Sequence, residues 1–342
     1  MTKVLMTGAT GFIGSHVAWI FCENGIEPTC LVRKTSDLSN IKDLPISLRY
    51  GDITNPQSLI EAFRGVDFVI HTAALVSDWD SYELFNKTNV TGTLNVLQAC
   101  IANKIKHVII TGSNAVYGEE DSKIVKNEAS PYNSHYPYFA DKILPCKLNY
   151  YRDTKAQAKK TAITYAKANN LNLTILEPVW VYGEKELNTG FLHYLQAARS
   201  ISFLPGSNSN NFHVIYARDL ARAYLLAFQK RLTGINSIII GNQESVLKNE
   251  INNLFCQYAG IKKPINVPKA ISYPLGFICE AVYTILKIKK PPLLTRGRVN
   301  LFYDNIEYST AKAKELLGFT CEYSLNEGIK KTVQWYKQRK MI

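Results

Sequence analysis

The 342-residue sequence lacks the long apolar runs that mark export signals and membrane spans. Its first eight residues lead directly into a short apolar run and a glycine turn, so a cytoplasmic location is expected. The longest apolar stretch, residues 271–288, is interrupted by Pro274, Glu280 and Lys287 and is too broken for a convincing span. We expect it to form a helix over the substrate pocket, and its amphipathic character leaves peripheral membrane contact through residues 271–290 as the alternative.

The sequence also lacks paired cysteines and dense blocks of charge. Its seven cysteines contain no Cys-x-x-Cys pair and are odd in number, so neither a disulfide framework nor a metal site is predicted. The formal net charge is +12, but lysine and arginine are spread along the whole chain. This distribution favours solvated surface lysines over a nucleic-acid interface. The net positive charge is still expected to help the chain attract a substrate or cofactor that carries phosphates.

What the sequence does contain is an alternation of short β-branched runs and amphipathic helical stretches. This pattern is typical of βαβ units and predicts an α/β Rossmann fold with a doubly wound parallel sheet. We expect a dinucleotide-binding domain in residues 1–182, joined by residues 214–241, and a smaller C-terminal substrate-binding lobe in residues 183–213 and 242–342. The strands are expected at residues 4–6, 29–32, 48–50, 68–71, 108–111, 173–176 and 237–240, and the clearest helices at 90–103 and 151–168.

Three glycines follow the first expected strand and open a helix over residues 15–24. Glycines let the backbone turn tightly and approach a pyrophosphate, and the helix N-terminus offers free N–H groups to the anion. The segment therefore predicts a dinucleotide site rather than a simple strand-to-helix turn. The residues expected to contact the cofactor here are Gly8, Thr10, Gly11, Phe12, Ile13 and Gly14.

Arg33 closes the second expected strand, nineteen residues beyond Gly14, where an NAD enzyme usually carries an acid for the ribose hydroxyls. An arginine with Lys34 and Ser36 beside it suits a 2′-phosphate, through bidentate, charge-assisted hydrogen bonds. The sequence therefore favours NADP(H) as the cofactor, with NAD(H) as the alternative.

The spacing Gly-x-x-Gly-x-x-Gly in residues 8–14 resembles the extended short-chain dehydrogenase/reductase superfamily, and further motifs of that superfamily follow in order. Asp52 and Ile53, after the third strand, resemble its adenine-contacting segment. Residues 71–74 (His-Thr-Ala-Ala) resemble the turn after its fourth strand, and residues 89–97 resemble its fourth helix. The cofactor contacts that this resemblance implies are Asp52, Ile53, Thr72, Ala73 and Ala74.

Hydride transfer at a carbinol carbon needs a proton acceptor or donor at its oxygen. A tyrosine can serve if a nearby lysine ammonium brings its pKa down from about 10, and residues four apart share one helix face. Tyr138 with Lys142 and Tyr151 with Lys155 both have this spacing. Pro145 would break a helix that begins at Tyr138, whereas Tyr151 stands at the start of a long helical stretch. We therefore choose Tyr151 and Lys155.

The resemblance also implies roles for Ser113 and Asn89. Ser113 matches the superfamily's catalytic serine, whose hydroxyl holds the substrate oxygen, and Asn89 matches a residue that supports the lysine through water. Residues 177–183 resemble the turn beside the nicotinamide, but Glu177 replaces the usual arginine, which argues against a nucleotide-sugar substrate. Further cofactor contacts are expected from Tyr151, Lys155, Pro178 and Val181, and substrate contacts from Val76, Ser113, Asn114 and Trp180.

Within the superfamily the chain is most similar to the branch of 3β-hydroxysteroid dehydrogenases and dihydroflavonol-reductase-like proteins. Residues 74–79, 291–296, 308–313 and 317–319 carry this similarity. It implies an oxidoreductase that interconverts a secondary alcohol and a ketone on a hydrophobic, steroid-like or aromatic substrate. An aromatic-rich insertion is expected to line an apolar pocket for that substrate. Its rings are Tyr132, Tyr136, Tyr138, Phe139 and Tyr150.

Two other functions stay open at this point. A nucleotide-sugar epimerase or dehydratase with tightly bound NAD shares the fold and the catalytic residues. A non-catalytic, NADP-sensing regulatory protein shares the fold, although such relatives typically lose the tyrosine or the lysine. The superfamily also implies a homodimer through residues 91–103 and 152–168.

Overall fold

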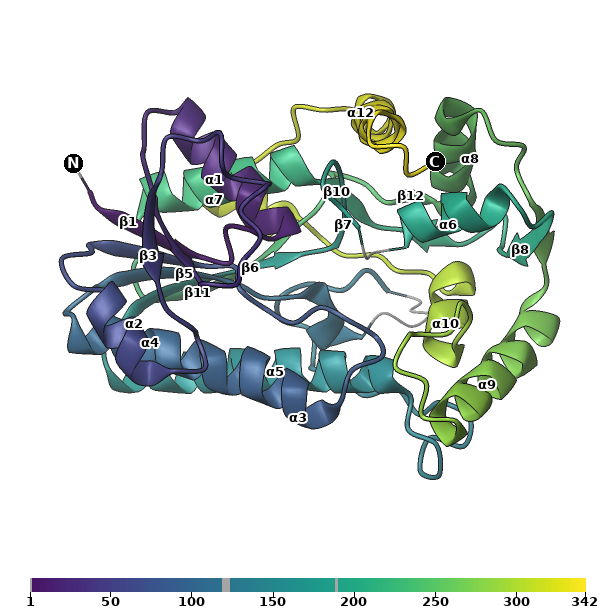
Figure 1. Cartoon of the computed structure of the whole chain (residues 1–342), viewed down its shortest axis with the longest axis horizontal. Coiled ribbons are helices and arrows are strands. Elements are labelled where there is room, and N and C mark those ends of the chain that lie inside the picture. The colour runs from purple at the N-terminus through teal and green to yellow at the C-terminus, as the bar shows by residue number, and fades with distance from the viewer. Residues whose placement is uncertain (1, 119–123, 188–189) are drawn as a thin grey trace.

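The computed structural model describes residues 2–118, 124–187 and 190–342, and a seven-stranded sheet runs through its middle (Figure 1). The strands lie in the order β11-β6-β5-β4-β1-β2-β3, and every neighbouring pair is parallel. The predicted α/β fold is therefore confirmed. The strands are β1 (Val4–Thr7), β2 (Thr29–Val32), β3 (Ser47–Tyr50), β4 (Phe68–His71), β5 (His107–Thr111), β6 (Asn172–Pro178) and β11 (Ile235–Ile240).

Helices cover both faces of this sheet (Figure 1). On one face α1 (Phe12–Glu23) packs against α7 (Ala217–Lys230), and on the other lie α2 (Pro56–Ala62), α4 (Gly92–Ala102) and α5 (Lys147–Ala168). Successive side chains of a strand point to opposite faces, so Val4 and Met6 enter one hydrophobic core while Leu5 enters the other. Burial on both faces explains why the central strands are largely apolar, whereas edge strand β3 is mostly exposed.

The strand order reverses at β1, which pairs with β2 on one side and with β4 on the other. Thr7, at the end of β1, lies beside Leu31 of β2 and His71 of β4. In open parallel sheets the ligand binds outside the carboxyl ends of the strands at such a reversal. The glycine turn and the segment after β4 both leave the sheet from this point, so the topology places the candidate site here.

The second lobe is built from segments that follow β6. Three small strand pairs belong to it: β7 with β10 and β8 with β13 are parallel, and β9 with β12 is antiparallel. After β10 the chain leaves the lobe and supplies α7 and β11 to the large sheet region. Helix α11, in the range expected to form the lobe, packs on that helix and strand. The strands are β7 (Trp180–Tyr182), β8 (Phe203–Pro205), β9 (Asn211–Phe212), β10 (Val214–Tyr216), β12 (Val246–Leu247) and β13 (Ile265–Val267). The helices are α6 (Phe191–Ala198), α8 (Lys248–Ala259), α9 (Lys269–Ile285), α10 (Arg296–Tyr303), α11 (Ala311–Leu317) and α12 (Leu325–Gln338).

Helix α9 forms from most of the apolar stretch of residues 271–288. The apolar stretch does form a helix, but its aliphatic side chains, such as Ile271, Leu275 and Ile278, are about half exposed, and Ser272 and Glu280 are buried instead. The predicted helix is therefore present, with its aliphatic side chains facing outward. In the part of the chain that the structure describes, no helix is long and apolar enough to cross a membrane.

A buried arginine fixes α9 to α10 and to the loop before α5. The Arg296 guanidinium forms an ion pair with Glu280 on α9, and both side chains are almost fully buried. The same guanidinium donates hydrogen bonds to the carbonyl oxygens of Phe139 and Leu144, the latter at 2.7 Å. One side chain thus joins three segments that are distant in sequence.

Arg296→Met is expected to lower the free energy of unfolding by about 3–5 kcal/mol, because it leaves the Glu280 carboxylate buried without its partner. Arg298→Met is the matched control, since Arg298 is partly exposed in its ion pair with Asp78 and such pairs contribute about 0–1 kcal/mol. Urea unfolding followed by circular dichroism measures both. Equal losses in the two variants would contradict this role of Arg296.

Candidate active site

The glycine turn after β1 is shaped by close backbone contacts. Gly8 has a φ of +76°, and a Cβ at this residue would stand 2.5 Å from the backbone nitrogen of Ala73. A Cβ on Gly14 would stand 2.1 Å from the Gly8 carbonyl oxygen. Gly11 begins α1 without a side-chain cap, so no side chain occupies the N–H groups of the first turn. These residues fit a pyrophosphate, and side chains at Gly8 or Gly14 would collide with the turn.

The neighbouring strand ends supply the rest of a dinucleotide site. Thr72 donates its hydroxyl to the Thr7 carbonyl at 2.8 Å, which joins the loop after β4 to the glycine turn. Asp52, after β3, accepts two hydrogen bonds from Thr54 through one carboxylate oxygen. The backbone of Ile53 is held by the Asn95 amide at 2.9 Å. The residues predicted to contact adenine and pyrophosphate therefore lie at one edge of the sheet.

Arg33 lies just beyond the end of β2, on this same edge. It and Lys34 are exposed, and Ser36 closes a tight turn by accepting the Arg33 N–H at 3.0 Å. The 36–40 segment is joined to the glycine turn through a hydrogen bond from the Asn40 amide to the Thr10 carbonyl at 3.0 Å. Two cationic side chains thus stand beside the glycine turn, and the described turn contains no acid at residues 33–36.

Lys155 connects α5 to the end of β5. Its Nζ donates to the Thr111 carbonyl at 2.7 Å, and only a small part of the residue is exposed. Burial lowers the pKa of Lys155 to about 8, against an opposing attraction from Glu177. Tyr151 lies one turn earlier on the same face of α5, with its ring against Phe85. A lysine ammonium is therefore held one helical turn from the tyrosine that the sequence selects.

Ser113 follows β5 by two residues and begins a short 3₁₀ helix, Asn114–Tyr117, that packs on α5. Its Oγ accepts the Ala115 N–H at 3.2 Å, so its own hydrogen can be donated to a ligand. Asn114 is buried beside it. The structure thus brings Ser113 to the strand edge that Lys155 reaches.

Asn89 has a different contact from the one that the resemblance implies. Its amide oxygen accepts the Leu75 N–H at 2.8 Å, and its amide nitrogen donates to the Leu75 carbonyl at 3.1 Å. The side chain lies in a π-helical segment, Asn86–Thr91, between α3 (Tyr82–Phe85) and α4. In the structure Asn89 fixes the loop after β4, the loop that carries the exposed Val76.

Tyr138, the competing tyrosine, is packed inside the protein. It is almost fully buried, its ring lies against Tyr136, and its hydroxyl accepts a hydrogen bond from Arg152 at 3.0 Å. Lys142 belongs to a turn rather than to a helix. The spacing of Tyr138 and Lys142 is thus not helical, whereas Tyr151 and Lys155 share α5.

The aromatic insertion does not converge on one cavity. Tyr132 packs on Tyr117, Tyr150 packs on Tyr82, and the exposed Phe139 packs on Phe277 of α9. The rings therefore serve as contacts between segments. Trp180, a predicted substrate contact, lies on β7 with its ring near Phe212 of β9. The predicted cofactor contacts Pro178 and Val181 lie close to it in sequence, at the end of β6 and on β7.

Sequence reasoning missed a buried ionic cluster beneath this edge. Glu177 accepts from the Tyr117 hydroxyl at 2.7 Å and forms a 2.8 Å ion pair with Lys159, one turn beyond Lys155. Burial raises the pKa of Glu177, and the Lys159 charge opposes that rise. The carboxylate is therefore committed to an internal pair, so its position does not support the argument that it repels a substrate diphosphate. The signal available in the sequence was the four-residue spacing of Lys155 and Lys159, which places both lysines on one face of the helix and indicates a buried partner for the second.

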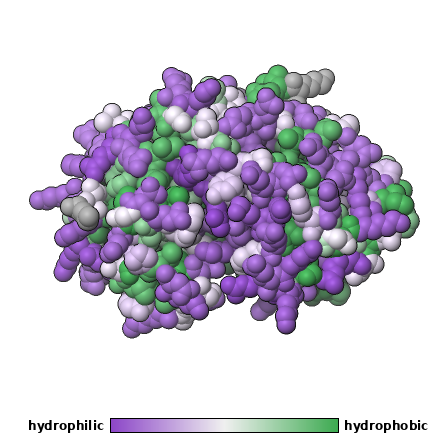
Figure 2. Space-filling view, turned by 90° about the horizontal axis from the view of Figure 1, so that it is seen from above, coloured by the Kyte–Doolittle hydropathy of each residue, from purple (hydrophilic) through white to green (hydrophobic). Residues whose placement is uncertain are grey.

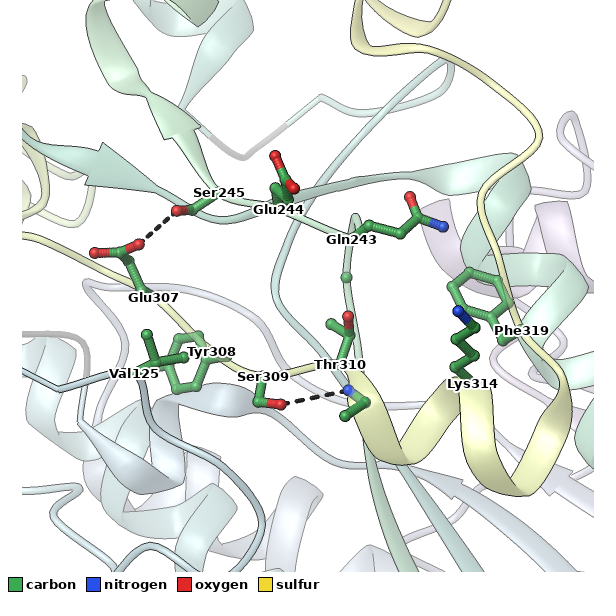
Figure 3. Close-up of a pocket in the computed structure, with 12 residues that line it drawn as sticks. Val125, Gln243, Glu244, Ser245, Glu307, Tyr308, Ser309, Thr310, Lys314 and Phe319 are labelled. Atoms are coloured by element: carbon green, nitrogen blue, oxygen red, sulfur yellow. Dashed lines mark hydrogen bonds between the residues drawn. The ribbon is translucent and has the colours of Figure 1, made fainter.

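A separate hollow of about 480 Å³ opens beyond β11 (Figure 3). Gln243 and Glu244 line one side, and residues 307–311 line the other, where Glu307 accepts from Ser245 at 2.6 Å. Lys314 and Phe319 bound one end (Figure 3). None of the described residues that were selected for cofactor or substrate lines it. Two of the motifs that indicate the sequence branch, residues 308–313 and 317–319, therefore contribute to this hollow.

Comparison with known proteins identifies the family. Residues 4–241, well over half of the chain, match the NAD dependent epimerase/dehydratase family. The chain belongs to this family. The predicted membership of the extended short-chain dehydrogenase/reductase superfamily is thereby confirmed.

Relatives in this family include reductases and dehydrogenases. A 2-alkyl-3-oxoalkanoate reductase of Stenotrophomonas maltophilia is 28% identical and is matched over 96% of this chain and 98% of its own. A decarboxylating sterol-4-alpha-carboxylate 3-dehydrogenase of Candida albicans is 26% identical and is matched over 99% of this chain and 98% of its own. These names support an oxidoreductase.

Solved structures agree on the fold. The crystal structure of gox2253 superposes with a TM-score of 0.81 at 25% identity, covering both chains fully. A UDP-glucose 4-epimerase of Thermotoga maritima, solved with UDP-glucose, superposes with a TM-score of 0.77 at 22% identity, covering 99% of each chain. Neighbouring structures contain NAD, in keeping with an NAD(P)-binding family.

Tyr151→Phe is expected to reduce turnover roughly 100-fold or more while leaving cofactor affinity nearly unchanged, because only proton transfer at the substrate oxygen is removed. Tyr138→Phe is the matched control, which loses the hydrogen bond from Arg152 and should lower thermal stability with turnover retained. Steady-state kinetics and cofactor titration by fluorescence measure both variants. The assignment fails if the Tyr138 variant loses activity while the Tyr151 variant retains it.

Proposed function

We propose that this chain is an NADP(H)-dependent oxidoreductase that interconverts a secondary alcohol and a ketone on a hydrophobic substrate, with Ser113, Tyr151 and Lys155 as its catalytic residues. The observation that carries the proposal is the buried Lys155 ammonium, 2.7 Å from the Thr111 carbonyl and one helical turn from Tyr151. Ser113 follows the same strand and has a hydroxyl hydrogen to donate.

Each of these residues has a distinct task. A bound nicotinamide cofactor supplies or accepts the hydride at the substrate carbon. In reduction, Tyr151 gives its hydroxyl proton to the substrate oxygen as the carbonyl becomes an alcohol, and in oxidation its phenolate takes that proton back. The Lys155 charge one helical turn away favours the phenolate form of Tyr151 over the neutral phenol. Ser113 donates a hydrogen bond to the same oxygen and fixes its position.

The names of the two relatives suggest a narrower substrate class. A 2-alkyl-3-oxoalkanoate carries its oxo group on the carbon next to the one that bears the carboxylate, and a sterol-4-carboxylate dehydrogenated at carbon 3 has the same arrangement. Both molecules combine an apolar body with this 3-oxo or 3-hydroxy acid. We propose the same class for this chain, with steroid-like and aromatic alcohols or ketones as the wider class.

Lys147 is a suitable partner for such a carboxylate. It is the first residue of α5, so Lys147, Tyr151 and Lys155 lie one turn apart on one face of the helix. The Lys147 Nζ lies 4.0 Å from the centre of the Trp79 ring and donates to the Trp79 carbonyl at 3.2 Å, in the segment that follows β4. Partial burial lowers the pKa of Lys147, and a carboxylate bound beside it would oppose this effect by stabilising the ammonium.

Two features support NADP(H) over NAD(H). Arg33 and Lys34 stand at the end of β2, and no acid occupies residues 33–36 of the described turn. A guanidinium binds a 2′-phosphate through parallel hydrogen bonds, whereas an acid there would repel it. The chain is also proposed to act in the cytoplasm as a homodimer that joins α4 and α5 of two copies, without binding nucleic acid.

A substrate panel tests the reaction class. Purified enzyme is supplied with NADP⁺ or NAD⁺ and a 2-alkyl-3-hydroxyalkanoate, a 3β-hydroxysteroid, an aromatic secondary alcohol or UDP-glucose, and absorbance of the reduced cofactor is followed. Turnover of the first three supports the proposal. Conversion of UDP-glucose to its 4-epimer, without net cofactor reduction and without turnover of the others, would establish the epimerase alternative. Cofactor binding with no turnover of any substrate would favour the regulatory protein.

Arg33→Asp is expected to weaken NADPH binding at least roughly tenfold more than NADH binding, because one phosphate partner is lost and a repelling charge is added. Arg64→Asp, the same change of charge in the exposed turn before β4 at the opposite edge of the sheet, serves as the control. Fluorescence titration of both cofactors gives the ratio. A wild-type preference for NADH would refute the NADP(H) assignment.

Lys147→Met is expected to raise the KM for the 3-hydroxy acid roughly tenfold while the KM for its methyl ester stays within twofold, because only the acid presents a carboxylate to the ammonium. Lys147→Arg should retain most of the preference for the acid. Parallel kinetics on acid and ester separate this effect from damage to α5, which would impair both substrates equally and thereby exclude a specificity role.

A further inference from the structure

Helix α9 has its apolar and polar sides reversed relative to a normal surface helix. Ile271, Leu275, Ile278, Val282 and Ile285 are spaced alternately by four and three residues, so they form one stripe about 100° wide. Their exposed fractions lie between 44% and 76%. In a helix that only packs on a core, this stripe would face inward.

The opposite side of α9 shows that this orientation is built into the fold. Ser272, Gly276 and Glu280 are the residues of α9 that are buried. A Cβ on Gly276 would stand 3.0 Å from the Thr295 carbonyl carbon, so the helix lies directly against the segment before α10. Glu280 is ion-paired with the buried Arg296. Turning the stripe inward would expose this pair and remove its hydrogen bonds.

A loop from the aromatic insertion extends the apolar surface. Phe139 and Ile143 are 66% and 88% exposed. The loop is attached to α9, since the Phe139 N–H donates to the Tyr273 hydroxyl at 3.2 Å and the Phe139 and Phe277 rings lie 5.3 Å apart. Figure 1 shows this loop beside α9 at one corner of the molecule. We call the stripe and this loop the α9 face.

The exposed charged side chains in the segments that form the α9 face are lysines, whereas Asp141 of the attached loop is mostly buried against His135. Between residues 261 and 295 the sequence contains one acid, Glu280, which is buried. Lys287, Lys289 and Lys290 follow the helix and are exposed, and Lys142 is exposed in the attached loop. A second copy of the chain docked through the same face would bring these lysines together, which disfavours a dimer there.

We propose that the α9 face docks on the anionic surface of a lipid bilayer, with the helix lying in the plane of the membrane. Aliphatic side chains would enter the boundary between headgroups and acyl chains, and the lysines would meet the anionic headgroups. By contrast, the face viewed in Figure 2, from above in the orientation of Figure 1, is largely hydrophilic, with hydrophobic residues in small separate groups. Docking through α9 therefore orients the molecule.

The position of α9 relates this surface to the substrate side. The Trp79 indole N–H donates to the Ile288 carbonyl at 3.0 Å, just beyond the helix, and the Trp79 and Tyr283 rings are in contact. Trp79 lies in the segment that follows β4, which also contains Val76. The Trp79 carbonyl accepts the hydrogen bond from Lys147. Docking thus brings lipid next to the segment that borders the proposed substrate site, where a poorly soluble substrate would be met. The docking itself does not depend on the proposed function.

Vesicle flotation of the full chain tests the proposal. Wild-type protein is expected to float with phosphatidylcholine vesicles that contain about one-third phosphatidylserine, at least roughly tenfold more strongly than with pure phosphatidylcholine. Ile278→Glu should reduce this binding at least roughly tenfold. Leu48→Glu, an exposed aliphatic position on edge strand β3, is the matched control and should bind like wild type. Thermal melts confirm that each variant is folded.

The lysines provide a second, independent readout. Replacing Lys287, Lys289 and Lys290 by glutamine should reduce binding to anionic vesicles by roughly 100-fold, about fivefold for each charge, and leave weak binding to neutral vesicles unchanged. Wild-type protein that does not float with anionic vesicles overturns the proposal. So does a dimer, detected by light scattering, that Ile278→Glu converts to monomer while no vesicle binding is found. Neither readout requires catalytic turnover, so a failure here is distinguishable from failure of the proposed function.

Discussion

The hydrogen bond from the Lys155 ammonium to the Thr111 carbonyl is the contact on which the candidate site depends. It ties the face of α5 to the carboxyl end of β5, with Ser113 two residues further along the chain. Burial makes the contact costly for a charged amine, and this cost appears as the lowered pKa of Lys155. In the proposed mechanism this lysine, one helical turn from Tyr151, favours the phenolate of that tyrosine when the amine is charged.

The surroundings of that contact are rigid for identifiable reasons. Beneath it, Glu177 and Lys159 neutralise each other inside the protein, and Gly112 is needed because a Cβ there would stand 2.7 Å from the Glu177 side chain. Beside it, Asn89 holds the loop after β4 by two hydrogen bonds to Leu75. The polar groups around the site are therefore mostly engaged in fixing its walls, and few are left to meet a substrate. Lys147, at the start of α5, is the group proposed to meet a substrate carboxylate, and it also contacts the wall through the Trp79 carbonyl.

The second lobe shows how a buried charge can determine a surface. Because Arg296 joins α9, α10 and the loop at residues 139–144, the small and polar side of α9 faces inward. The apolar side is then left exposed as a direct consequence. The loop brought along by the same guanidinium adds Phe139 and Ile143 to that exposed surface.

The sequence alone determined the sheet, the glycine turn and the placement of Tyr151 and Lys155 on one helix, because period, spacing and proline positions are local properties of the chain. It also placed the strand ends that carry Arg33, Asp52, Thr72 and Ser113 on one edge, since parallel strands share their direction. Only the tertiary structure decided the orientation of α9, the pairing of Glu177 with Lys159 and the contacts of Asn89. Each of these rests on a charge or an amide meeting a partner from another segment, and the energy of such pairs depends on burial and distance, which residue order does not specify.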